Sequence, residues 1–192
     1  GTRNAIFGTG YLNNAYAAGD QRKAASILDI EAYKAANPSF NITYQVAPYK
    51  NTGLYSQKYQ PRKGETSGQL ELNYLNNYRI IRYADVLLMA AEAWNKSSTP
   101  NDTKAQGYLN QVRRRAFGNN ANDINASGNA LYLAILTERR LELAMEGDRF
   151  FDLVRTGQAA TAITGFTVGK HELFPIPLEE VTISGLSQNP GY

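Results

Sequence analysis

The stretch LTERRLELAMEGDRFFDLVRTG, residues 136–157, carries the residue types and spacing that come closest to chemistry. Carboxylates at Glu138, Glu142 and Glu146 recur every four residues, which places them on one face of a helix. A glycosidase would use two carboxyl groups as acid and base, about 5–10 Å apart across an open cleft, with the pKa of one of them raised. The alternative is that nearby cations neutralise these mutually repelling charges within packed protein.

Arginines at helical spacing supply such cations. Arg139 lies three residues before Glu142, and Arg149 lies three residues after Glu146. Nearby arginines lower the pKa of a carboxyl group, whereas a catalytic acid needs its pKa raised. We therefore predict a structural network of ion pairs and no catalytic residue. Its members are Glu138, Arg139, Glu142, Glu146, Arg149, Asp152 and Arg155.

The composition excludes several other kinds of chemistry. The chain has no cysteine, so it has no disulfide, thiolate nucleophile or cysteine metal site. Its single histidine, His171, cannot build a multi-histidine metal site, and we predict no metal and no cofactor. The net charge is only +3 with the basic residues spread out, which argues against nucleic acid as a partner. No apolar run approaches the ~18 residues that span a bilayer.

The elements that would position these residues fall into three parts. For residues 1–78 we predict an irregular part of mixed secondary structure. FNITYQVAPY and GLYSQKYQ should form short strands, and SILDI either a strand or a helix. Residues 79–158 predict two antiparallel helix pairs, 79–118 and 129–158. Residues 159–192 predict an extended segment, because Pro175 and Pro177 interrupt a helix.

Apolar spacing and end signals define the four helices. Ile81, Ala84, Leu88 and Ala91 form the core face of the first helix. Thr99 is predicted to cap the second helix, which Gly118 ends. The third helix is predicted over residues 131–146, with Leu133, Leu136 and Leu143 in register, and Asp148 begins the fourth. The pairs predict a mostly α, tetratricopeptide-like fold, whose two repeats need further helices to complete a stable stack.

Several stretches in family order resemble the SusD/RagB family of nutrient-binding outer-membrane lipoproteins. They are YAAGDQRKAASIL, YSQKY, NNYRIIRYADVLLMAAEAWNK, YLNQVRRRAFG, LTERRLELAMEGDRFFDLVRTG and LFPIPLEEVTISGLSQNPGY. The resemblance covers nearly the whole chain and matches the carboxyl-terminal region of the family. It implies a mostly α protein in which tetratricopeptide-like pairs support an irregular ligand-binding part.

The resemblance also implies the function. Family members capture glycans or peptides at the cell surface for a SusC-type TonB-dependent transporter of the outer membrane, without catalysis. Their membrane contact is an amino-terminal lipid anchor, which we expect upstream of Gly1. Aromatic faces and amides suit sugars, and on this ground we predict ligand contacts at Tyr11, Asn13, Asn14, Tyr16 and Tyr49. The alternative is a helix-repeat module that binds only protein.

Overall fold

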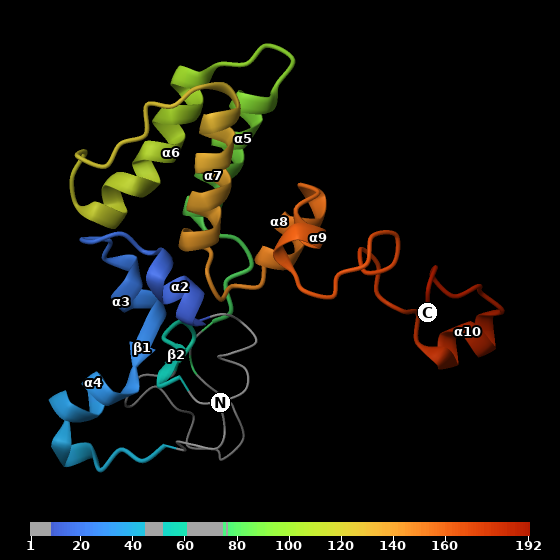
Figure 1. Ribbon diagram of the computed structural model, residues 1–192, viewed down its shortest axis with the longest axis horizontal. Coiled ribbons are helices and arrows are strands. Elements are labelled where there is room, and N and C mark those ends of the chain that lie inside the picture. The colour runs from blue at the N-terminus through green and yellow to red at the C-terminus, as the bar shows by residue number, and fades with distance from the viewer. Residues whose placement is uncertain (1–8, 45–51, 61–74, 76) are drawn as a thin grey trace. The chain divides into compact units, whose positions relative to one another are not determined.

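Three long helices form the centre of the first of two compact units. The computed structural model describes residues 9–44, 52–60, 75 and 77–192, and the chain divides into Gly1–Glu146 and Gly147–Tyr192. In the first unit, α5 (Tyr83–Lys96) and α6 (Asp102–Phe117) form an antiparallel pair (Figure 1). Helix α7 (Gly128–Glu142) packs against both of them. The predicted mostly α fold with short strands is confirmed.

One hydrophobic core of this unit lies between the three helices. Leu88 of α5, Leu109 of α6 and Ile135 of α7 are fully buried there. Ala91 of α5 and Ala105 of α6 belong to the same core and have no exposed surface. Trp94 is partly buried against the same core, in agreement with a packing role. Because the apolar residues recur every three or four positions, each helix turns one face inward.

The beginnings of α5 and α6 differ from the prediction. Helix α5 starts at Tyr83, so Ile81 precedes the helix and is 64% exposed, where the sequence predicted a core residue. Helix α6 is capped by Asn101 and not by Thr99, because the side-chain oxygen of Asn101 accepts a hydrogen bond from the amide of Lys104 at 3.0 Å. Asparagine is among the preferred capping residues, which accounts for the later start.

Helix α7 ends one turn earlier than predicted. The amide of Leu143 still donates to the carbonyl of Arg139, but the chain then turns, and Met145 has the left-handed φ of 65°. The predicted end at residue 146 is therefore wrong, and so is the core role of Leu133, which is half exposed. Leu136 and Leu143 are buried as expected. The early turn separates Glu146 from the helix that carries Glu138 and Glu142.

Short elements precede the helix layer in the first unit. They are α2 (Thr9–Ala15), α3 (Arg22–Ser26), β1 (Ile27–Asp29), α4 (Ile30–Ala36), the 3-10 turn η1 (Pro38–Phe40) and β2 (Leu54–Ser56). Strands β1 and β2 are antiparallel, with Ile27 opposite Ser56 and Asp29 opposite Leu54. SILDI is thus strand only over Ile27–Asp29. Residues 41–44 of the predicted strand FNITYQVAPY form no strand, and residues 45–49 lie outside the described residues.

The second unit contains α8 (Arg149–Arg155), α9 (Ala159–Ala162) and α10 (Leu178–Ser184). Asp148 precedes α8 as predicted, although its side chain forms no capping bond. The prediction of an extended segment over residues 159–192 is wrong for residues 159–162 and 178–184, which are helical. Pro177 stands at the amino-terminal cap of α10, where a missing amide hydrogen costs nothing, so proline here permits a helix to begin.

Candidate functional site

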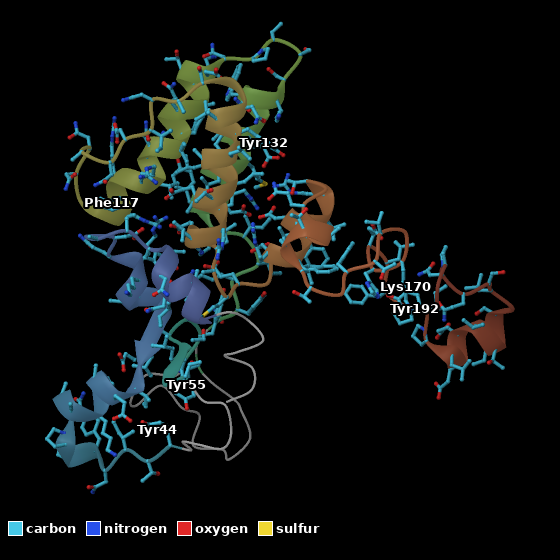
Figure 2. All side chains as sticks on the ribbon, in the orientation of Figure 1. Tyr44, Tyr55, Phe117, Tyr132, Lys170 and Tyr192 are labelled. Atoms are coloured by element: carbon cyan, nitrogen blue, oxygen red, sulfur yellow. The ribbon has the colours of Figure 1, made fainter. Side chains whose placement is uncertain are left out.

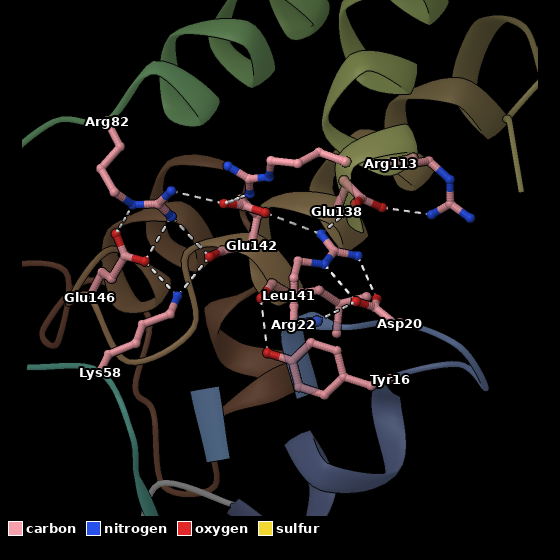
Figure 3. A network of polar contacts seen from close by, with 11 residues as sticks. Tyr16, Asp20, Arg22, Lys58, Arg82, Arg113, Glu138, Leu141, Glu142 and Glu146 are labelled. Atoms are coloured by element: carbon pink, nitrogen blue, oxygen red, sulfur yellow. Dashed lines mark hydrogen bonds and ion pairs between the residues drawn. The ribbon is translucent and has the colours of Figure 1, made fainter. Parts of the chain in front are cut away.

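A cluster of buried carboxylates and cations connects distant segments of the first unit (Figure 3). Glu138 has only 1% of its side chain exposed, and its two oxygens accept hydrogen bonds from Arg22 at 2.6 Å and Arg113 at 2.7 Å. Glu142, with 2% exposed, accepts from Arg82 at 2.9 Å and Arg115 at 2.6 Å. These carboxylates are therefore occupied by arginines from α3, α6 and the segment before α5.

Glu146 completes the carboxylate row from the turn after α7. Its oxygens accept hydrogen bonds from the ammonium group of Lys58 at 2.5 Å and from Arg82 Nε and Nη2, each at 2.7 Å. The same Lys58 ammonium donates to the carbonyl of Glu142 at 2.8 Å. Lys58 lies just after β2, so these bonds fasten the irregular part to the end of α7.

Asp20 and Arg22 form the amino-terminal side of the network. Both oxygens of Asp20 accept from the Arg22 guanidinium, at 2.9 and 2.6 Å. Sequence spacing alone missed five of the cations and one carboxylate: Arg22, Lys58, Arg82, Arg113, Arg115 and Asp20. The stretches YAAGDQRKAASIL and YSQKY, which carry the family resemblance, contain three of these residues: Asp20, Arg22 and Lys58.

The cations lower the pKa of the glutamates despite burial. Burial alone raises the pKa of Glu142, but the hydrogen bonds and charges of Arg115 and Arg82 outweigh it and hold the pKa below its usual range. Burial likewise raises the pKa of Glu146, and Arg82 and Lys58 together reverse that effect. The pKa of Lys58 is itself lowered, because burial outweighs the attraction of Glu146. Ionised and paired, these glutamates lack the raised pKa of a general acid.

The remaining predicted network residues have other placements. Arg139 donates to Asp85 of α5 at 2.7 Å, whereas the sequence paired it with Glu142. Arg155 pairs with Asp152 at 2.7 Å in the second unit, and both residues were predicted members of the network. Arg149 belongs to the same unit and is exposed in the first turn of α8. The first-unit network consists of Asp20, Arg22, Lys58, Arg82, Arg113, Arg115, Glu138, Glu142 and Glu146.

The predicted ligand contacts lie in different environments. Tyr16 is 7% exposed, and its hydroxyl donates to the carbonyl of Leu141 at 3.0 Å, so both its ring and its polar tip serve packing in this structure. Asn14 is exposed and Asn13 half-buried, and the Asn13 amide donates to the Asn14 side chain at 3.5 Å. Tyr11 belongs to α2, but its side chain lies outside the described residues, as does Tyr49. Ligand contact at these positions stays a prediction.

Exposed aromatic surface occurs in both units. In the first unit, Tyr59 and Tyr78 stack with ring centroids 5.2 Å apart and an interplanar angle of 28°. In the second unit, Phe150, Phe166, Phe174, His171 and Tyr192 surround a hollow of about 270 Å³. The ammonium of Lys170 lies 4.6 Å from the centre of the Tyr192 ring (Figure 2). Aromatic faces of this kind bind flat apolar surfaces, which include the faces of sugar rings.

The described residues contain neither a cluster of metal-ligating side chains nor a membrane-spanning helix. Among them, no group of three or more histidine, cysteine, aspartate or glutamate residues could hold a metal ion. In the same part of the chain, no helix has both the length and the apolar character needed to cross a membrane.

Comparison with known proteins gives one consistent result. The model of the SusD family matches residues 6–192. A SusD-like protein of Formosa agariphila is 34% identical over 132 residues, which are 60% of this chain and 26% of that protein. The chain thus spans about a quarter of the length of this curated relative.

Solved structures resemble the chain along most of its length. A laminarin-binding SusD-like protein is 40% identical with a TM-score of 0.74, over 95% of this chain and 37% of that one. Surface glycan-binding protein A from Bacteroides thetaiotaomicron, in complex with laminarihexaose, is 30% identical with a TM-score of 0.76, over 92% of this chain and 39% of that one. Because the family model matches almost every residue, the chain belongs to the SusD family.

Proposed function

We propose that this chain is part of a cell-surface protein that binds glycans without altering them and delivers them to a SusC-type TonB-dependent transporter of the outer membrane. The observation that carries the proposal is the likeness to a laminarin-binding SusD-like protein, at 40% identity over 95% of the chain. The relative in complex with laminarihexaose supports the same ligand class. A lipid anchor in the complete protein would hold it at the outer membrane.

Binding without catalysis agrees with the electrostatics of the buried network. A glycoside hydrolase needs one carboxyl group of raised pKa facing the substrate. Glu142 and Glu146 have lowered pKa values and accept hydrogen bonds from arginine and lysine side chains. Glu138 is equally enclosed, with 1% of its side chain exposed. These three groups therefore stabilise the fold, and ligand recognition falls to aromatic faces and amides at the surface.

Calorimetry with a panel of oligosaccharides that includes laminarihexaose tests the proposal. We expect saturable binding by the complete protein and no release of reducing ends during prolonged incubation. Release of reducing ends that Glu138→Gln abolishes without loss of fold would instead identify an enzyme. Absence of binding across the panel would contradict glycan capture.

The helix layer also carries surface that suits a protein partner. Tyr83, Val86 and Met89 follow each other at three-residue spacing on α5 and are 73%, 44% and 44% exposed. An apolar stripe on the outer side of a helix whose inner side is already packed favours a protein contact. In our proposal it serves docking of the protein rather than sugar binding.

This stripe also favours the alternative function, a helix-repeat module that binds only protein. Affinity electrophoresis in gels containing polysaccharides separates the two functions. Retardation in at least one gel supports the glycan-binding protein, and uniform migration across all gels favours the protein-binding module.

A further inference from the structure

Tyr59 has an unusual backbone conformation for its residue type. Its φ of 61° lies in the left-handed region, which a bulky side chain adopts only at a cost in free energy. Such conformations persist where the surrounding structure fixes them, and they gather at ligand sites. In this structure the preceding residue, Lys58, holds the backbone at Tyr59 in place. The Lys58 ammonium is held by Glu146 and by the carbonyl of Glu142, and the Lys58 carbonyl accepts from the hydroxyl of Ser56 at 3.3 Å.

The strained residue directs its ring against a second tyrosine. Tyr59 and Tyr78 stack with centroids 5.2 Å apart, and we call this pair the tyrosine platform. The Tyr78 hydroxyl donates to the carbonyl of Glu146 at 2.9 Å, and the Tyr59 hydroxyl donates to the carbonyl of Arg79 at 3.4 Å. Glu146 therefore holds Tyr78 directly, through its backbone carbonyl, and Tyr59 indirectly, through the ion pair of its carboxylate with the preceding Lys58.

The platform is rigidly held and yet open. Tyr78 is 65% exposed although its hydroxyl is bonded and one face of its ring meets Tyr59. So large an exposed fraction includes part of the ring of Tyr78. Gln57 and Gln60, close to Tyr59 in sequence, and Asn77, next to Tyr78, have exposed side chains as well. Each of their amides offers both a donor and an acceptor.

We propose that the tyrosine platform is a carbohydrate subsite, in which one pyranose ring of a bound glycan lies on the open face of Tyr78. An aromatic face packs against the apolar C–H face of a sugar, and the flanking amides match its hydroxyl groups. A surface already fixed by the buried network loses little conformational entropy when the ligand binds. This inference rests on the proposed glycan-binding function and assigns it a site that sequence spacing did not identify.

The test is calorimetric titration of the complete protein with laminarihexaose and the other panel ligands. We expect Tyr78→Ala to weaken binding by at least about fivefold, which is typical of the loss of an aromatic anchor. Tyr78→Phe keeps the ring and removes only the hydroxyl, so its affinity should stay within about twofold of wild type. The matched control is Tyr33→Ala, a tyrosine 41% exposed on α4, which should bind like wild type.

Two results would overturn the subsite and leave glycan binding intact: unchanged affinity of Tyr78→Ala, or equal losses in Tyr78→Phe and Tyr78→Ala. Equal weakening by the Tyr33→Ala control would also overturn it, because the effect would then not belong to the platform. If Tyr78→Ala fails to fold, Tyr78→Leu keeps the apolar bulk without the aromatic face and should show the same loss. Failure of the wild-type protein to bind any glycan would instead refute the proposed function, and the subsite with it.

Discussion

Replacing Glu142 by glutamine perturbs the centre of the buried network without changing the shape of the side chain. Glu142 accepts hydrogen bonds from Arg82 and Arg115, and Arg22 lies 3.4 Å from its second oxygen. Glutamine removes the negative charge and replaces one acceptor oxygen by an amide group that donates hydrogen bonds. Arginine side chains also only donate, so this amide cannot form a hydrogen bond with them. The substitution thus leaves buried positive charge with less compensation.

The size of the loss follows from what each cation retains. Removal of one partner from a buried ion pair typically costs about 3–5 kcal/mol. Arg82 keeps both oxygens of Glu146, and Arg22 keeps Asp20 and Glu138, so most of the positive charge stays paired. We therefore expect a loss near the lower end, about 3 kcal/mol of unfolding free energy. For a chain of this size that corresponds to a fall in Tm of about 6–12 °C.

Urea and thermal unfolding, followed by the far-ultraviolet circular dichroism of the helices, measure this loss. Asp123→Asn is the matched control, because it makes the same change in net charge at a carboxylate that pairs with Arg114, whose side chain is 54% exposed. We expect no measurable loss of stability for that variant. Equal effects of Glu142→Gln and Asp123→Asn would refute the reasoning, since burial would then play no part.

Two further predictions concern pH and backbone conformation. The pKa values of Glu142 and Glu146 are lowered in the folded chain, so the unfolded chain binds protons first, and stability should fall as pH drops below the ordinary carboxyl pKa of 4.5. Unfolding midpoints measured from pH 7 to 3 test this. In the double variant Glu142→Gln/Glu146→Gln, the unfolding midpoint should depend less steeply on pH. An unchanged slope would count against the network. Gly118→Ala should destabilise by about 1 kcal/mol, because Gly118 ends α6 with a left-handed φ of 73°. In the same helix, Gly107→Ala should stabilise the chain by about 1 kcal/mol, because its added methyl group meets no atom within 4 Å. Urea titration compares the unfolding free energies of the two variants. A change of the same sign in both would contradict the explanation.

Helix identity could be predicted where apolar residues recur without interruption. The core positions Ala84, Leu88 and Ala91 of α5 follow directly from three- and four-residue spacing. Helix ends were harder to predict, because capping depends on which of several neighbouring polar residues reaches a free amide. Asn101 prevails over Thr99 at α6, and the proline before α10 permits a helix where the sequence suggested none.

Pairing within the network illustrates the limit of local spacing. The three-residue spacing of Arg139 and Glu142 predicted a bond along α7. In the structure Arg139 instead donates to Asp85 of α5. Glu142 accepts hydrogen bonds from Arg82 and Arg115, which lie 60 and 27 residues away in sequence. A buried carboxylate is stabilised by every donor that the packing brings near, whatever its distance along the chain.

The sequence by itself determined that the carboxylates of α7 share one face, that cations are present to neutralise them, and that helices dominate the fold. These properties depend on residue type and on the 3.6-residue helical repeat, which are local. Only the tertiary structure decided which cation meets which carboxylate, and that Tyr59 and Tyr78, 19 residues apart, stack at the surface. Such contacts arise when chain segments close loops to bury apolar surface, and no periodicity in the sequence encodes that closure.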